Sequence, residues 1–470
     1  MGSLQNKSIK IIWPWIHAFG FFALFAMQMT QYYYWNFYAA FFPNRYAAFA
    51  AAFIMLYYVI KRFKDGRGVK ILTLYALWVL LTRIISGCFF NEDDLLFSTG
   101  MFVCVLSLAL AYQFDVKKRQ ALLNVLTIVF IGIITFVSAI GVYAALIQKP
   151  VDIDFFGKTL NAADFRYQEG VLRLRIADAH PNISACWVFL CIFLLVNRFF
   201  SSGNIIIKLL VVLAIITDYL AMALTNCRTI YMCFAICAGM LAALLVLNRH
   251  NYVKTSSKIL VLVLSIAVVS PLAYKSVDIS LKGINYISMR IAAESEITDG
   301  EGIAGEDDTL YENSRGTIWD DTSTLKPRII IWKSALETVK QEPLRLVIGS
   351  SKEKLTDISN ELNVLPGFEI VHYHNMFLNI LMLTGIPGFI IAIVFLYVLI
   401  KKMIILFFSK DTDASLAEKT LVLPLTGYIL YGATLEVLLF TEADIRTFAF
   451  FLIAGVLLAD CRDLRTGEKE

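Results

Sequence analysis

Long apolar stretches alternate with short polar segments along almost the whole 470-residue chain. Twelve of them approach the roughly 17–25 helical residues that are needed to cross the hydrocarbon core of a membrane. Because a spanning segment must satisfy its own backbone hydrogen bonds, we predict an α-helix for each stretch. The predicted spans are residues 11–30, 43–60, 70–88, 95–113, 121–146, 180–197, 205–224, 228–247, 258–273, 375–400, 420–440 and 445–459.

The amino-acid composition agrees with this pattern. Hydrophobic residues make up 58% of the chain and charged residues only 17%, whereas soluble domains average about 25% charged residues. The mean hydropathy is +0.67. The sequence therefore predicts an all-α polytopic membrane protein with about 12 transmembrane helices.

The positions of lysine and arginine predict which side of the membrane each segment faces. With the N-terminus inside, residues 61–70 alone hold five Lys and Arg, whereas the four short outer loops hold only Arg45, Arg228 and Arg446. Short inner loops are enriched in these residues in multi-pass proteins, so we expect both termini in the cytoplasm. The net charge of +4 then reflects topology and does not indicate nucleic-acid binding.

Two long segments fall on the predicted outer side, residues 147–179 and residues 274–373. They divide the chain into three parts. Residues 1–273 contain nine predicted spans, residues 274–373 form an extracytoplasmic loop domain with a helical part, and residues 374–470 contain three spans and a cytoplasmic tail.

The loop domain has two halves of different character. Residues 294–325 contain ten Asp and Glu against a single Arg, Arg315, with few apolar residues, which predicts a flexible acidic insertion. Residues 327–349 have apolar residues at helical spacing and end near Pro343 and Gly349. We therefore predict a helix on the outer surface over 327–349.

Three arginines come out on the predicted outer side, next to an apolar span or to the surface helix: Arg175, Arg228 and Arg328. Taken singly, each has an ordinary explanation, as part of a basic loop, as a side chain at the membrane interface or as a charge on an amphipathic helix. Taken together they suit a diphosphate, because the guanidinium fork binds phosphate through two hydrogen bonds and keeps its charge.

Two of the five histidines, His372 and His374, precede Asn375 at the start of the tenth predicted span. Imidazole titrates near neutrality, so a histidine here is a candidate base for a hydroxyl nucleophile. The structural alternative is that His374 or Asn375 caps free N–H groups at the start of the helix. The two roles are compatible.

Charged residues elsewhere have structural explanations. Arg83 and Asp218 lie inside predicted spans, where a charge must face a cavity or a partner, and we expect structural ion pairs. We expect the acidic clusters at residues 91–94 and 151–154 to be solvated loop ends.

Four blocks of sequence together resemble the bacterial O-antigen ligase and polysaccharide polymerase family. HYHNMFLNILMLTGIPG, from His372, is similar to the family's His-Asn signature and its Gly-x-x-Gly break, and PRIIIWKSALETVKQEPLRLVIG is similar to its surface helix. TNCRTIYM around Arg228 and RLRIADAHPNISA from Arg173 resemble two further family motifs. The second of these departs from the family, because Ile-Ala-Asp follows Arg175 where the family has glycine.

The resemblance implies an inner-membrane glycosyltransferase with its active site on the extracytoplasmic side. Such an enzyme transfers glycan from an undecaprenyl diphosphate carrier to an acceptor sugar, as in lipopolysaccharide or capsule synthesis, with inversion and without a metal or other cofactor. His374 then activates the acceptor hydroxyl, while Arg228 and Arg328 hold the diphosphate and stabilise its developing charge. The implied substrate-binding residues are Arg175, Asn182, Trp332, His372 and Asn375.

Other functions fit the sequence less well. A metal-dependent membrane glycosyltransferase would need carboxylates in an early outer loop, and the first predicted outer loop has no Asp or Glu. A flippase of the same lipid-linked glycan would place acidic residues at mid-membrane, for which Asp218 and Glu436 are the candidates. A non-catalytic scaffold would have no use for the Arg and His set. Ligase and polymerase share donor and site, so both remain open.

Overall fold

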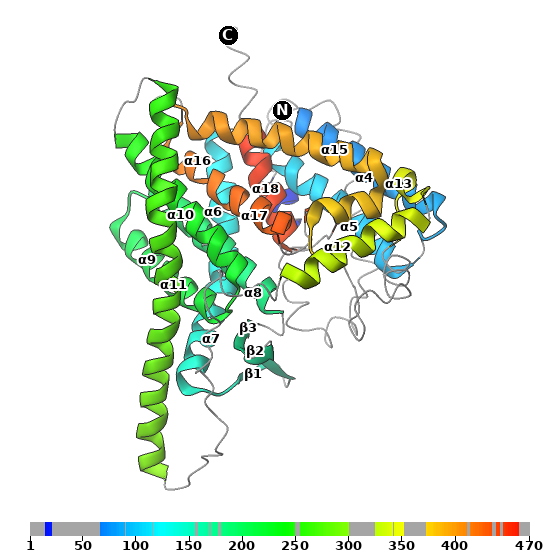
Figure 1. Ribbon diagram of the computed structural model, residues 1–470. Helices are drawn as coiled ribbons and strands as arrows, with labels where there is room; N and C mark the ends of the chain where they lie inside the picture. The colour runs from blue at the N-terminus through cyan, green and yellow to red at the C-terminus, as the bar shows by residue number, and fades with distance from the viewer. Residues whose placement is uncertain are drawn as a thin grey trace, which may run out of the picture.

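The structure is a computed structural model in which a helical bundle carries a small sheet at one end (Figure 1). The predicted spans 11–30 and 43–60 lie outside the described residues, apart from residues 15–20. The structure describes residues 15–20, 66–89, 91–114, 116–155, 158–168, 171–176, 180–249, 254–299, 325–341, 343–351, 373–410, 414–434, 439–441 and 445–459.

Helices dominate the described residues, and three strands follow one another between α7 and α8. The helices are α4 (Arg67–Ile85), α5 (Glu92–Leu110), α6 (Val116–Phe130), α7 (Phe136–Ile147), α8 (Pro181–Ser201), α9 (Ile205–Leu224), α10 (Arg228–Arg249), α11 (Thr255–Asp299), α12 (Leu325–Gln341), α13 (Arg345–Ile348), α15 (Met376–Phe407), α16 (Leu416–Thr420), α17 (Val422–Thr434) and α18 (Ile445–Ala459). A π-helical turn, Ile131–Thr135, joins α6 to α7 without interruption. The strands are β1 (Val151–Phe155), β2 (Lys158–Gln168) and β3 (Val171–Ile176).

Seven helices in the described part of the chain are long and apolar enough to cross a membrane. They are Arg67–Ile85, Lys118–Ile147, Pro181–Ser201, Ile205–Leu224, Arg228–Arg249, Thr255–Ser288 and Met376–Phe407. Two shorter apolar helices, Phe97–Gln113 and Arg446–Ala459, belong to the same bundle. The prediction of a helical multi-pass membrane protein is confirmed, while the count of 12 spans and the cytoplasmic side of both termini stay predictions.

Helix α8 lies in the interior of the bundle, packed against α17 and α18. Trp187 and Phe189 of α8 are fully buried. Gly427 of α17 lies against the ring of Phe189, where a Cβ atom would come within 2.1 Å of it. In contrast, α9 and α11 expose large apolar side chains such as Leu213 and Val268, as expected for helices that face lipid.

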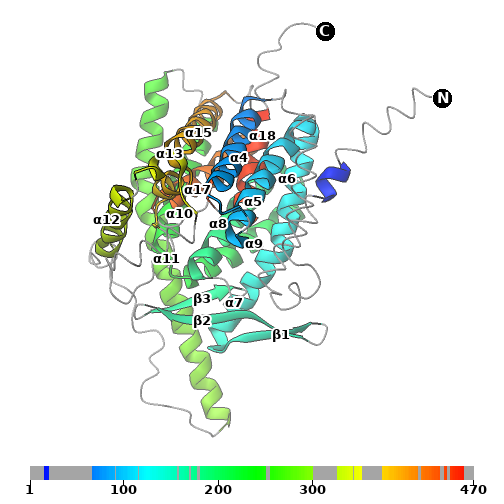
Figure 2. The same cartoon turned by 90° about the vertical axis from the view of Figure 1, so that its right-hand side faces the viewer.

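The segment 151–176 forms a three-stranded antiparallel sheet in the order β1-β2-β3, which is a departure from the all-α prediction. The sheet lies across one end of the bundle, next to α7 (Figure 2). Leu174 and Ile176 are fully buried, and Gly141 of α7 gives Leu174 room to pack. The alternation of apolar and basic residues along 171–176 has the period of two that is typical of a strand.

Helix α11 is much longer than the predicted span 258–273. Its 45 residues correspond to about 68 Å at the rise of an α-helix, and it runs well past the rest of the bundle in Figure 1. Residues 294–299 of the predicted acidic insertion belong to this helix, and residues 300–324 lie outside the described residues.

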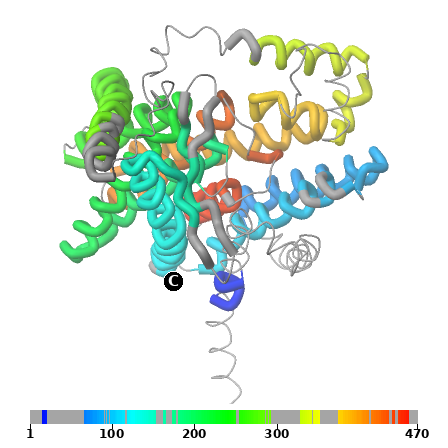
Figure 3. Tube along the Cα trace, turned by 90° about the horizontal axis from the view of Figure 1, so that it is seen from below, coloured from blue at the N-terminus to red at the C-terminus, as the bar shows by residue number. Residues whose placement is uncertain are grey.

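The predicted surface helix 327–349 is present as α12 and α13, which are separated near Pro343. Viewed from below, both lie at the edge of the bundle beside α15 (Figure 3). The buried face of α12, with Ile331 and Ala335, packs on Met382 and Leu383 of α15. Thus α12 is attached to the first part of α15.

Helix α15 is broken at Gly385, where the backbone has φ 68° and ψ −178°. Residues 376–384 therefore form a separate short helix, which we call the half-helix. Gly349, just after α13, packs on this break so closely that a Cβ would lie 2.2 Å from the carbonyl oxygen of Leu383. The Gly-x-x-Gly break that the sequence indicated after His374 is thus a sharp change of direction in the chain.

Of the two buried charges for which we expected structural ion pairs, Arg83 forms one and Asp218 has a different partner. Arg83 forms an ion pair with Asp94 at 3.2 Å, and both side chains are buried. The prediction that residues 91–94 form a solvated loop end is wrong for Asp94, because α5 begins at Glu92 and draws it into the bundle. Asp218 accepts a hydrogen bond from Thr135 Oγ1 at 2.9 Å in place of the expected ion pair.

Replacing Gly385 with alanine should lower stability strongly. With φ 68° and ψ −178° the backbone lies in a region that essentially only glycine occupies, and a residue with a Cβ is strained there by about 1–3 kcal/mol. This Cβ would also lie 2.4 Å from the carbonyl oxygen of Val347. We expect a clear fall in the melting temperature of the purified protein. Gly283→Ala is the control, because a Cβ at Gly283 meets nothing within 4 Å. Equal melting temperatures for the two variants would contradict the prediction.

Candidate active site

The last turn of α17 is the place where several predicted site residues meet. Helix ends leave their final carbonyl groups without partners inside the helix, so other groups must satisfy them. Here two of the carbonyls have donors from distant blocks of sequence, and a third block accepts a hydrogen bond from a side chain of the same turn. Tyr431 Oη donates to the backbone oxygen of Asn182 at 3.0 Å, Asn375 Nδ2 donates to Ala433 O at 3.1 Å, and Arg328 Nη1 donates to Thr434 O at 3.1 Å.

A glycine in the same turn brings α15 close. Gly432 lies against Met376, the first residue of α15, and a Cβ there would come within 3.2 Å of the methionine sulfur. The contact places the start of α15 directly on the end of α17. His374 and Asn375, which precede Met376, are therefore held at this end of the bundle, which we call the site end.

The backbone around His374 is fastened by bonds to two neighbouring helices. Asn375 is the N-cap of α15, and its side-chain oxygen accepts from the Leu378 N–H at 3.1 Å. Its amide group also bonds α17, so one side chain completes one helix end and joins another. The capping role that we considered for this pair belongs to Asn375. His374 itself is half-buried and has φ 48°, a left-handed conformation that is uncommon outside glycine.

Helix α12 supplies two of the predicted residues. Trp332 Nε1 donates to the carbonyl oxygen of Tyr373 at 2.9 Å, directly beside His374. Arg328, one turn earlier on α12, reaches α17 instead. Tyr373 is itself buried, and its N–H donates to Asn379 Oδ1 at 3.2 Å. Trp332 thus orients the peptide next to His374, and nothing in these contacts requires a sugar or a lipid.

Strand β3 and the start of α8 form the opposite side of the same end. Arg173 is buried and donates from Nε to Thr225 O at 2.9 Å, and from Nη2 to Asn182 Oδ1. Thr225 closes α9, so Arg173 satisfies a carbonyl at that helix end. His180 caps α8 by accepting from the Asn182 N–H at 3.3 Å.

Arg228 is the first residue of α10 and lies at the same end of the bundle. Helices α10 and α17 run antiparallel and touch where Cys237 Sγ donates to Leu423 O at 3.2 Å. From this contact to Arg228 is about 14 Å along α10, and to Thr434 is about 17 Å along α17. The two helix ends therefore lie at a similar level. Arg228 is half-buried there.

Two predicted residues are not joined to this arrangement. Arg175 lies in the sheet, where its guanidinium faces the carboxylate of Asp164 on β2 at 3.9 Å and both side chains are about a quarter exposed. His372 lies outside the described residues. In the described part of the chain, no group of three or more His, Cys, Asp and Glu side chains is placed to ligate a metal ion.

Sequence reasoning missed the last turn of α17 and gave Arg173 too little weight. Tyr431, Ala433 and Thr434 stand in an unremarkable apolar span, and two of them contribute only backbone oxygen atoms. No residue type signals such a contact. The signal for Arg173 was available, because it stands two residues before Arg175 in the same alternating stretch ahead of the Pro-Asn pair at 181–182.

Residues 209–393 match the family model described as O-antigen ligase. Residues 209–393 are an O-antigen ligase domain. This confirms the family that the four motifs indicated. No curated protein matches the chain.

The O-antigen ligase domain contains Arg228, Arg328 and His374, whereas Asn182 and α17 lie outside it. The hydrogen bonds described above therefore connect the O-antigen ligase domain with segments before and after it. A site that includes α8 and α17 uses more of the chain than the matched domain.

The two arginines of β3 should differ in their effect on stability. Arg173→Gln removes buried hydrogen bonds from a charged donor, each worth about 1.5–3 kcal/mol, whereas the partly exposed pair of Arg175 is worth about 0–1 kcal/mol. Thermal melting of Arg173→Gln and Arg175→Gln checks this. A larger fall in melting temperature for Arg175→Gln than for Arg173→Gln would contradict this prediction.

Proposed function

We propose that the protein is a glycosyltransferase of the inner membrane that moves a glycan from an undecaprenyl diphosphate carrier to an acceptor sugar on the extracytoplasmic side. The observation that carries this proposal is the O-antigen ligase match over 209–393, which includes all three residues with proposed chemical roles. The bonds of Arg328 and Asn375 to adjacent carbonyls of α17 support it, because they hold two of the family motifs against one helix turn.

In the proposed reaction His374 is the general base. It takes the proton from the acceptor hydroxyl as the hydroxyl oxygen attacks the anomeric carbon of the donor glycan. The new bond joins this oxygen to the anomeric carbon, and the bond from that carbon to the diphosphate oxygen breaks. Attack from the opposite face inverts the anomeric centre. Undecaprenyl diphosphate leaves with the electron pair.

Arg228 and Arg328 are the proposed partners of the leaving diphosphate. Negative charge increases on the diphosphate as the bond breaks, and fixed donors that already point at this charge lower the barrier. Arg328 is fixed by its bond to Thr434 O. Asn182, Asn375 and Trp332 hold the surrounding backbone, and Arg175 and His372 stay secondary candidates for binding.

Substitution at the proposed base and at one proposed cation should abolish transfer without unfolding the protein. In His374→Asn the new asparagine also tolerates the left-handed backbone conformation at this position. Loss of a general base lowers the rate by about 10²–10⁴-fold. Arg328→Lys keeps the charge but loses the fork, and removal of such a donor costs about 10²–10³-fold. Purified protein with a lipid-linked glycan donor gives the rates.

Lys333→Gln is the matched control for Arg328→Lys, because Lys333 lies on the exposed face of the same helix. It should transfer glycan at the wild-type rate. Full turnover by both His374→Asn and Arg328→Lys would refute the proposed roles.

The proposed chemistry uses fixed arginine cations in place of a metal ion. Treatment of the purified protein with a chelator should therefore leave the transfer rate unchanged. Activity that disappears with the chelator and returns with manganese would contradict this mechanism.

One rival function has structural observations in its favour. Broken helices and buried carboxyl groups are common in transporters, and the structure has a break at Gly385 and a buried Asp218. Reconstituted protein with a defined lipid-linked repeat unit separates the possibilities. A ladder of products indicates a polymerase, a single product on an added acceptor indicates a ligase, and movement of the donor between leaflets without any product indicates a transporter.

A further inference from the structure

The half-helix, residues 376–384, links the proposed base to a second polar cluster. It is about 13 Å long, with His374 and Asn375 directly before its first residue and the break at Gly385 at its far end. A short helix of this kind behaves as a rigid rod. Whatever holds the far end therefore also fixes the direction in which His374 is presented.

The far end of the half-helix is held at three consecutive carbonyl groups. A helix end needs outside donors for its last carbonyls, and within an apolar bundle water does not supply them. Two of the donors come from α4 and one from the chain just after α13. Ser350 N–H donates to Met382 O at 3.0 Å, Arg83 Nη2 donates to Leu383 O at 2.7 Å, and Trp78 Nε1 donates to Thr384 O at 2.7 Å.

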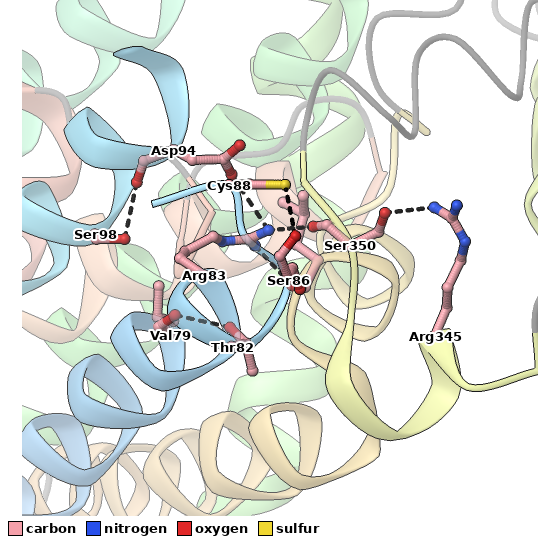
Figure 4. Close-up of polar contacts among 10 residues, drawn as sticks. Val79, Thr82, Arg83, Ser86, Cys88, Asp94, Ser98, Arg345 and Ser350 are labelled. Carbon is pink, nitrogen blue, oxygen red and sulfur yellow. Dashed lines mark hydrogen bonds and ion pairs between the residues drawn. The ribbon is translucent and has the colours of Figure 1, made fainter. Parts of the chain in front are cut away.

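Among these donors, Arg83 is the one that joins the most segments. Besides Leu383 O it bonds to the carbonyl oxygen of Ser350, it pairs with Asp94 of α5 at 3.2 Å, and its guanidinium lies 5.3 Å from the ring centre of Phe97. Figure 4 shows Arg83 between Asp94 on one side and Ser350 on the other. One guanidinium therefore ties α4 and α5 to the chain after α13 and to the half-helix.

The positive charge of Arg83 also suits its position at the C-terminal end of the half-helix. The C-terminal end of a helix carries a partial negative charge, so a buried positive group is stabilised there. Asp94 balances the charge, and the planar fork bonds two separate carbonyls at once, which a lysine cannot do in the same geometry. Arg345 adds a further tie by donating to the Ser350 hydroxyl (Figure 4).

We propose that Arg83 is a positioning residue for glycan transfer, which holds the half-helix in the direction that places His374 for proton removal. This inference rests on the proposed function. Arg83 touches neither donor nor acceptor in the proposed reaction. Although α12 packs on the half-helix, Arg328 is also anchored by its own bond to Thr434 O of α17. Loss of Arg83 should therefore slow the chemical step and leave donor binding by Arg228 and Arg328 unchanged.

The test compares Arg83→Lys with wild-type protein in single-turnover transfer and in donor binding. Arg83→Lys keeps a charge beside Asp94 but loses the fork, and a displacement of about 1 Å at a reacting group costs up to about 100-fold in rate. We expect a rate at least about 10-fold lower with unchanged donor affinity. Arg119→Lys is the matched control, because Arg119 is also buried and bonds a backbone carbonyl, Phe114 O, just before its own helix α6.

A double-mutant cycle separates positioning from general damage. If Arg83 acts through His374, Arg83→Lys should have little further effect in the His374→Asn background, because the interaction is already lost. If Arg83→Lys slowed transfer through general structural damage, its fold-loss in rate would multiply with that of His374→Asn. The double variant Arg83→Gln with Asp94→Asn is measured alongside, since it removes both charges and leaves no buried ion unpaired. We expect the same loss of rate for it.

The outcomes are distinct. A slow chemical step, unchanged donor affinity and a non-multiplying cycle support the role of Arg83. The role would be overturned if Arg83→Lys transferred glycan at the wild-type rate. It would also be overturned if donor affinity fell in parallel with the rate, or if Arg119→Lys showed the same loss of rate. Wild-type protein that transfers no glycan at all refutes the proposed function itself, and the role of Arg83 falls with it.

Discussion

The last carbonyl groups of a helix have no partners inside it, and much of the site end is organised by the need to satisfy them. Three arginines from distant parts of the chain do this at three helix ends. Arg83 bonds to the end of the half-helix, Arg173 to the end of α9 and Arg328 to the end of α17. The same need that completes these helices thus places a cation at each of the three helix ends.

This arrangement joins a structural role to a chemical one. An arginine held by a carbonyl is fixed in place before any substrate arrives, which is the condition for effective stabilisation of a developing charge. It follows that Arg328 has two consequences when it is lost, a weaker end of α17 and a missing partner for the diphosphate. Lysine is therefore a more informative replacement than alanine at this position, because it preserves the charge beside the helix end.

The amount that sequence alone could predict differs between parts of the molecule. Hydropathy located the spans from residue 70 onward, since lipid and core both demand apolar side chains. It did not predict that α11 would continue to Asp299, because its second half is polar enough to resemble a loop. The sheet formed by β1, β2 and β3 was missed although apolar and basic residues alternate in β3 as in a strand, because β1 and β3 are short and the sheet lies between long helices.

Within the candidate site, the motifs located His374, Arg228 and Arg328 but not what connects them. The contacts run through backbone oxygens of Ala433, Thr434 and Leu383, and a carbonyl group is the same in every residue. For this reason, α17 looked like an ordinary span. The resemblance to a family identified the side chains of the site, whereas the backbone contacts that connect them are visible only in the structure.

The π-helical turn at Ile131–Thr135 has an evolutionary implication. Its wider spacing accommodates one residue more than an α-helix of equal length, so it has the form of a single-residue insertion retained within a span. Deleting one residue there would rotate all of α7 by about 100°. Gly141 would turn away from Leu174, and the sheet that carries Arg173 would lose this packing contact with α7. Homologues without this extra residue should therefore carry a differently anchored sheet.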